Sequence, residues 1–94
     1  MTAITRLGDL STGHGCFPAR PSISASPNVF CNGIPVIRVG DLYAVHCCVI
    51  PCHGGSLAAG SSKVFVNGLA LGRVTDPISC GDTVGQGSPN SFCG

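Results

Sequence analysis

Two histidines and one cysteine follow three copies of a short motif at almost the same spacing. His14 and His46 each come five residues after the Asp of their copy, and Cys80 comes four residues after its Asp. If the three copies pack around one axis, these side chains meet near it. Imidazole nitrogen and thiolate sulfur are the ligands that zinc prefers in structural sites, so the spacing predicts a metal site near an axis of threefold pseudosymmetry. The motif is Arg-x-x-Asp, at Arg6–Asp9, Arg38–Asp41 and Arg73–Asp76.

A structural zinc site needs four ligands, and His53 is the fourth candidate because it is the only histidine left. The predicted ligand set is therefore His14, His46, His53 and Cys80. A rival set clusters within seven residues, at Cys47, Cys48, Cys52 and His53. Adjacent side chains of an extended chain point to opposite sides, so Cys47 and Cys48 would rarely bind one ion. Another mixed Cys/His site and the absence of any metal stay open as alternatives.

The composition argues against catalysis and against a nucleic-acid partner. The chain has four Asp and no Glu, and three of the four Asp belong to the repeated motif, which leaves no paired carboxylates for acid–base chemistry. It also lacks the H-E-x-x-H pattern of metallohydrolases. Five Lys and Arg give a net charge of only +1, which is no electrostatic footprint for nucleic acid. We therefore expect a protein that is not an enzyme.

The expected redox state of the seven cysteines depends on the cellular compartment. The segment from Met1 to Arg6 lacks the basic and apolar regions of a signal peptide, and no run of eighteen apolar residues predicts a transmembrane helix. An odd number of cysteines without a secretion signal favours a reducing cytoplasm. We therefore expect thiols that are mostly free or metal-bound, with no essential disulfide framework.

A second repeated block precedes two of the Arg-x-x-Asp motifs. Ser26–Gly33 matches Ser61–Gly68, and Ser88–Gly94 is a truncated third copy. Each complete copy holds Asn-Gly between apolar residues, which is a strong signal for a two-residue hairpin because both turn positions need positive φ. The two ends of the chain supply complementary halves. Joined in space, Ser88–Gly94 and Ala3–Asp9 would form a third unit and close a ring.

These repeats predict an all-β fold of short strands. Gly and Pro make up 21 of the 94 residues, and the longest stretch without either, Asp41–Ile50, is too short for an ordinary helix. Residues three apart lie on opposite faces of an extended strand, so we expect each motif Asp to accept backbone N–H bonds at a bend. Three equivalent phenylalanines suggest either a shared central cluster or a small pocket for each ring, at Phe30, Phe65 and Phe92.

With these motifs, almost the whole chain resembles the PAAR-repeat family, whose members cap the spike of type VI secretion systems and of related contractile phage tails. The Pro-Ala-Ala-Arg tetrapeptide is met loosely at Ala3–Arg6, Pro35–Arg38 and Ala70–Arg73. Arg-x-Gly-Asp, Val-Phe-x-Asn-Gly and the segment around His14 are similar to more specific elements of the family. Thr75 stands where the family usually has Gly, and Gly72 stands where it usually has Ala.

The resemblance implies a conical (pyramidal) fold of short strands with threefold pseudosymmetry. Members of the family often carry fused effector domains. This chain begins within three residues of its first repeat element and ends inside its last, so we expect a single PAAR-repeat domain over residues 1–94 without a fused effector. The resemblance also implies a vertex closed by one structural Zn²⁺ ion on three His and one Cys. Carried over residue by residue, these ligands are His14, His46, His53 and Cys80.

The resemblance further implies a structural tip that caps and sharpens a spike for envelope piercing and links cargo effectors to it. The partner would be a trimeric β-helical spike protein, VgrG-like or from a phage, with one tip per trimer and a monomeric chain when alone. Such a tip is assembled in the cytoplasm and is then delivered out of the cell at the end of the spike, or sits at the virion tail tip. The alternative is a cytosolic zinc-binding interaction module.

Overall fold

The computed structural model describes residues 1–94 and consists of strands, turns and loops without any helix, so no helix is present that could span a membrane. Its strands form four separate antiparallel pairs. They are β1 (Thr2–Ala3) with β8 (Phe92–Cys93), β2 (Phe30–Cys31) with β3 (Ile34–Pro35), β4 (Leu42–Cys47) with β5 (Cys52–Ser56), and β6 (Phe65–Val66) with β7 (Leu69–Ala70). The predicted all-β architecture of short strands is confirmed.

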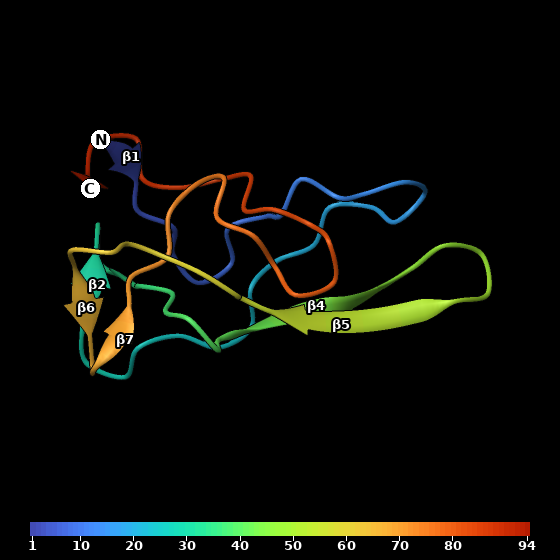
Figure 1. Cartoon of the computed structure of the whole chain (residues 1–94), viewed down its shortest axis with the longest axis horizontal. Coiled ribbons are helices and arrows are strands. Elements are labelled where there is room, and N and C mark those ends of the chain that lie inside the picture. Colours follow the sequence, from blue (N-terminus) through green and yellow to red (C-terminus); the bar gives the residue numbers. More distant parts are fainter.

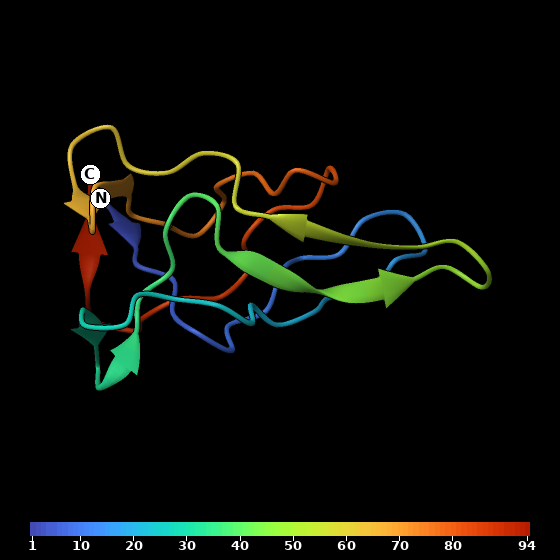
Figure 2. The ribbon, with the colours of Figure 1, turned by 90° about the horizontal axis from the view of Figure 1, so that it is seen from below.

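The molecule is elongated, with extents of 37 × 23 × 21 Å. Three of the strand pairs, β1–β8, β2–β3 and β6–β7, lie together at one end, and the longer β4–β5 hairpin runs to the other end (Figure 1). Seen after a quarter turn, the three short pairs lie around the long axis (Figure 2). We call the end formed by these three pairs the base, and the end formed by the β4–β5 turn and the loop at residues 13–17 the vertex.

The third unit of the base is assembled from both chain ends, as the repeat predicts. β1 and β8 pair with Ala3 opposite Phe92, which corresponds to Phe30 opposite Pro35 in β2–β3 and to Phe65 opposite Ala70 in β6–β7. The two Asn-Gly turns also have the predicted geometry. Asn32 and Gly33 have φ of 55° and 75°, and Asn67 and Gly68 have φ of 54° and 79°. The β-hairpin predictions are therefore confirmed.

Buried serines join neighbouring units into a ring. The Ser26 hydroxyl donates to Asn67 Oδ1 at 2.7 Å, and the Ser88 hydroxyl donates to Asn32 Oδ1 at 2.6 Å. In the third position, Ser61 donates to the backbone carbonyl of Gly94, because Gly94 stands where the other copies have Asn32 and Asn67. A buried hydroxyl is costly without a partner, so these bonds favour a closed ring over separate units.

Each motif Asp makes the expected backbone bond and also an ion pair. In the second copy, Asp41 Oδ2 accepts the Arg38 backbone N–H at 2.7 Å and the Nε–H at 3.0 Å, while Nη2 donates to Oδ1 at 2.9 Å. The other copies repeat this arrangement. The assumption that the two side chains lie on opposite faces was wrong. Between them the chain turns through a residue with positive φ, at Gly8, Gly40 and Thr75, which brings Arg and Asp to the same side.

The core consists of two layers of mainly apolar side chains stacked along the axis. The layer next to the base holds Cys31, Val36, Val66, Leu71 and Cys93, and the next layer holds Ile37, Tyr43, Leu57, Ile78 and Val84. Neither interpretation of the phenylalanines is correct. Phe30, Phe65 and Phe92 are 57%, 60% and 48% exposed, because side chains alternate along a strand and the residue after each Phe takes the inward position.

Candidate metal centre

His46 and His53 lie directly opposite each other on the β4–β5 hairpin. A β-bulge produces this pairing. Tyr43 pairs with Gly55, and the register then shifts by one residue before His46 pairs with His53. Without the extra residue, Val45 would face His53. The bulge also lets Tyr43 and His46, which are three residues apart, both be buried on the inner side of β4, as expected where two residues of one strand oppose one of the other.

His14 and Cys80 are carried on two tight turns that meet the hairpin. His14 and Phe17 exchange both backbone hydrogen bonds, at 3.1 and 2.8 Å, and close a turn that contains Gly15 with a φ of 55°. Cys80 lies in a turn closed by the Gly81 N–H, which donates to the Ile78 carbonyl at 3.0 Å. The four predicted residues thus come from one hairpin and two turns that are distant from one another in sequence.

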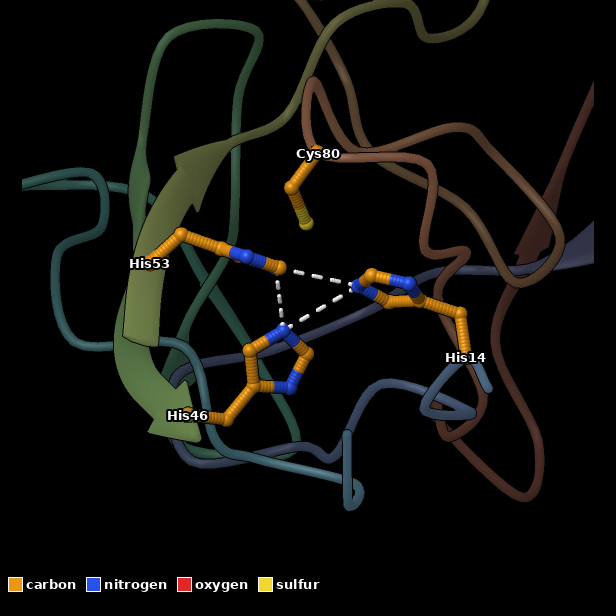
Figure 3. A group of neighbouring side chains, drawn as sticks. All are labelled: His14, His46, His53 and Cys80. Carbon is orange, nitrogen blue, oxygen red and sulfur yellow. Dashed lines mark hydrogen bonds between the residues drawn. The ribbon is translucent and has the colours of Figure 1, made fainter. Parts of the chain in front are cut away.

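The four side chains converge on one point (Figure 3). The Nε2 atoms of His14, His46 and His53 form a triangle with sides of 3.2, 3.0 and 2.7 Å. All four ligand atoms, including Cys80 Sγ, lie within 4.8 Å of one another. Two nitrogens bound to one tetrahedral Zn²⁺ are separated by about 3.3 Å, since each Zn–N bond is about 2.0–2.1 Å. The side chains therefore fit a metal ion of this kind.

The surroundings of the histidines hold their rings in place. His46, which is only 3% exposed, has Nδ1 at 2.7 Å from the carbonyl oxygen of Pro18. The Phe17 ring packs against all three imidazoles, with centroids 4.9, 4.9 and 4.2 Å away. Partial burial and the neighbouring His46 and His14 lower the pKa of His53, which favours the neutral imidazole that a metal requires. The cluster can bind a metal ion.

The sequence matches the family described as PAAR motif over residues 12–86. The chain belongs to this family. The match covers most of the chain and includes all four converging side chains, so the resemblance seen in the repeated motifs is confirmed.

Three curated toxins contain a segment similar to this PAAR chain. This chain is 36% identical to double-stranded DNA deaminase toxin A of Burkholderia cenocepacia over 73 residues. The matched segment covers 74% of this chain and 5% of the toxin. This chain is also 31% identical over 78 residues to NAD(P)(+) glycohydrolase toxin Tse6 and to (p)ppApp synthetase toxin Tas1, both of Pseudomonas aeruginosa. Each of these matches covers 77% of this chain and 18% of the toxin. The PAAR chain spans less than a fifth of these relatives.

Two charged residues next to the His/Cys cluster of this PAAR protein were not predicted as part of the site. Arg20 Nη2 donates to Cys80 Sγ at 2.9 Å, and Arg20 Nε lies 3.9 Å from Asp82 Oδ2. Both side chains are buried. One signal was available in the sequence: these are the only Arg and the only Asp outside the repeated Arg-x-x-Asp motifs.

The expectation that most thiols of this PAAR chain are free was wrong. Cys16 is bonded to Cys48, and Cys47 is bonded to Cys52. The adjacent Cys47 and Cys48 do point to opposite sides, so each reaches a different partner. The β4–β5 hairpin places Cys47 opposite Cys52, and the loop at residues 13–17 brings Cys16 to Cys48, so the fold itself holds these thiols together. Three cysteines are free, at Cys31, Cys80 and Cys93.

Proposed function

We propose that this chain is the structural tip of a spike in a type VI secretion or contractile phage-tail apparatus, and that it caps a trimeric β-helical protein with one chain per trimer. The proposal rests on the threefold arrangement of the base. Three equivalent strand pairs surround one axis there, although the third is built from both termini. A single chain with three similar faces can match three identical subunits at once, so it needs no threefold oligomer of its own.

The chemistry of the base favours an apolar contact surface. Phe30, Phe65 and Phe92 are each about half exposed or more at equivalent positions, and large exposed apolar groups gathered on one face are typical of a protein interface. Each short pair is two-stranded. The Ala3, Pro35 and Ala70 carbonyls of β1, β3 and β7 already accept bonds from other segments of the chain. The outer edges of β8, β2 and β6 are therefore the ones that a partner strand would extend, which is a common mode of recognition. Only 10% of the residues are charged, so apolar contact and backbone hydrogen bonds dominate.

We further propose that His14, His46, His53 and Cys80 hold one Zn²⁺ ion that closes the vertex. Four protein ligands fill a tetrahedral ion and leave no position for a substrate, so the ion has a structural role and the chain has no catalytic one. Two of the three segments that carry the ligands, around His14 and Cys80, are turns, and the third is the far end of the β4–β5 hairpin. Ordering such backbone costs about 1–2 kcal/mol per residue, and a structural zinc site supplies about 10–16 kcal/mol of apparent binding free energy.

The relatives support a role in carrying effectors. Three proteins named as toxins contain a segment like this chain, which is expected if such a segment attaches a toxin to a spike. In this proposal the chain is monomeric before assembly, is assembled on the spike in the cytoplasm and leaves the cell at its tip.

Multi-angle light scattering of the chain mixed with a trimeric β-helical spike protein tests the stoichiometry. We expect the free chain to be monomeric and the complex to contain one chain per trimer. The complex should persist at raised salt, because salt screens charged contacts far more than apolar ones. Three chains per trimer, or dissociation at moderate salt, would contradict the tip proposal.

A further inference from the structure

The charged residues of the chain fall into three groups. Nine residues are charged, and six of them form the three repeated ion pairs that shape the turns of the fold. Lys63 is exposed. The remaining two, Arg20 and Asp82, have side chains that are 3% and 0% exposed and meet beside the metal cluster. Burying such a pair costs desolvation free energy that the pair itself regains only with good geometry, and here Nε and Oδ2 are 3.9 Å apart and make no hydrogen bond.

Other contacts of the Arg20 guanidinium account for its position. Nη2 donates to Cys80 Sγ at 2.9 Å, and Nη1 donates to the His53 carbonyl oxygen at 3.4 Å. One planar group therefore contacts two of the segments that carry the converging side chains. The Tyr43 ring lies against the guanidinium, 5.8 Å from its central carbon to the ring centroid. The fork of N–H donors in Arg suits such divergent contacts, whereas a Lys ammonium is a single point charge.

Asp82 is held so that its charge stays next to this guanidinium. Its Oδ1 accepts the Thr83 backbone N–H at 2.8 Å and the Thr12 hydroxyl at 2.9 Å. Thr12 lies on the loop of His14, and Asp82 lies on the turn of Cys80. The Ser11 Oγ accepts the Arg20 backbone N–H at 3.2 Å. This network joins the His14 loop and the Cys80 turn through polar groups that are not themselves metal donors.

The close approach of Arg20 to Cys80 leaves no room for a side chain at residue 55. A Cβ built on Gly55 would lie 3.0 Å from Arg20 Nη2 and 3.2 Å from Cys80 Sγ, and only 2.9 Å from Ile78 Cγ2. A larger residue at position 55 of β5 would displace Ile78, the guanidinium or the sulfur, so glycine allows these groups to pack against the hairpin. The contact is built into the backbone of the site.

We propose that Arg20 is a positioning residue for the sulfur ligand, which acts by donating an N–H bond to Cys80 Sγ and thereby directing the sulfur toward the three histidine nitrogens. This inference rests on the proposed metal site. Hydrogen bonds from surrounding residues orient metal ligands and tune the metal, and their loss commonly weakens metal affinity about 10–100-fold. Asp82 in turn holds the guanidinium and balances its charge. Arg20 thus favours metals that accept a thiolate ligand.

Cobalt(II) titration of the metal-free full chain tests this role, because the charge-transfer absorption of a Co–thiolate bond reports the sulfur ligand directly. The wild-type chain should show this absorption together with the intense visible bands of tetrahedral Co²⁺. Arg20→Met should bind Co²⁺ about 10–100-fold more weakly, with a weaker or shifted thiolate band. Arg20→Lys should give an intermediate affinity, since it retains the charge but cannot make all the contacts. The matched control is Arg38→Met, which removes an ion pair near the base and should leave the Co²⁺ spectrum unchanged.

The outcomes separate the role of Arg20 from the site itself. A wild-type chain that binds no Co²⁺, or binds it without a thiolate band, overturns the proposed metal site and this inference with it. A wild-type thiolate band that Arg20→Met reproduces at equal affinity overturns only the role of Arg20, as does an equal loss in Arg38→Met. If Arg20→Met does not fold, then Arg20→Lys and Asp82→Asn decide, and wild-type affinity and spectrum in both would overturn the role.

Discussion

The Nδ1 atom of His46 lies 2.7 Å from the Pro18 carbonyl oxygen, while its Nε2 atom faces the other two histidines. A carbonyl oxygen can only accept, so Nδ1 carries the proton and Nε2 has a free lone pair. Such a second hydrogen bond fixes the tautomer and the orientation of a metal-binding imidazole. Among the three histidines, His46 is also the buried one. The imidazole of His46 is therefore preorganised to bind a metal ion.

This arrangement predicts unequal effects of removing the histidines. His46→Ala should reduce zinc affinity by more than about 100-fold, because the loss of a ligand exceeds the loss of an outer-shell partner and leaves the Pro18 carbonyl without its donor. His53→Ala should cost less, since His53 is only partly buried and water can replace it. Competition titration with a chromophoric chelator measures both affinities. Full metal content in His46→Ala and Cys80→Ala would contradict the ligand set.

The two disulfides should differ in their effect on stability. Cys16–Cys48 closes a separation of 32 residues and Cys47–Cys52 one of 5 residues. Chain entropy assigns about 3–4 kcal/mol to the longer loop and about 2 kcal/mol to the shorter one. Replacing each pair with serines and measuring urea unfolding should give this order. Thiol titration of the oxidised protein under denaturing conditions should find the three free cysteines, and seven free thiols would contradict both bonds.

Thr75 is strained where the other two units have glycine. Its φ is 77°, and the equivalent Gly8 and Gly40 have φ of 89° and 95°. A left-handed conformation costs a residue with a side chain about 1–2 kcal/mol, and the extra freedom of glycine in the unfolded chain offsets about 0.5–1 kcal/mol of that. Thr75→Gly should therefore stabilise the fold by up to about 1 kcal/mol. The reverse change, Gly40→Thr, should destabilise it although its Cβ would meet no atom within 4 Å. Stabilisation in Gly40→Thr would refute the argument.

Acid should weaken the fold through carboxylates that are ionised in the native state. Burial opposes ionisation of Asp41, but the ion pair and hydrogen bonds from Arg38 and a bond from Ser24 outweigh it and lower the pKa of Asp41. A group with a lowered native pKa stabilises the fold fully above its unfolded pKa of about 3.9, and this contribution is lost as the pH falls through the native pKa.

The free energy of unfolding of the wild type should accordingly decrease once the pH is below about 4. In Asp41→Asn it should depend less on pH. Chelator is included in both titrations, because protonation of histidine ligands releases metal at higher pH. The control is Lys63→Met, which alters an exposed charge and should retain the wild-type slope. The same slope in Asp41→Asn as in the wild type would exclude Asp41 as the source.

Much of the fold was predictable because the chain repeats itself. The Asn-Gly turns, the unit formed by both termini and the convergence of His14, His46 and Cys80 all depend on the spacing between copies. His53 is different: it belongs to no repeat position, and it reaches the cluster only because the bulge in β4 aligns it with His46. A bulge adds one residue without a clear sequence signal, so this contact was predicted by elimination rather than by geometry.

Two kinds of feature were not predicted: which face of a short strand each residue occupies, and which segments distant in sequence meet in the fold. Alternation along a two-residue strand shows that one of two neighbours faces inward but not which one. Phe30 was therefore expected in a central cluster or in a pocket of its own, whereas Cys31 is the buried residue. Cys16 and Cys48 each lie two residues after a converging histidine, so the repeat indicates that they are close, but the expectation of reduced thiols led away from a bond between them. Arg20 belongs to no repeat, and its role is visible only once Cys80 is placed beside it.

The exposed phenylalanines of the base allow binding to be tested separately from folding. Because Phe30 and Phe65 are more than half exposed and Phe92 nearly so, replacing all three with Ser should change the unfolding free energy little. Burying a large apolar side chain at an interface contributes about 1.5–3 kcal/mol, so the triple variant should bind the trimeric spike at least about 100-fold more weakly. The matched control is Val49→Ser, which removes an apolar side chain that is 95% exposed at the vertex and should bind normally. Calorimetric titration measures the affinities and thermal unfolding checks the fold. Undiminished binding by the well-folded triple variant, or a comparable loss in Val49→Ser, would place the contact surface elsewhere than on the base.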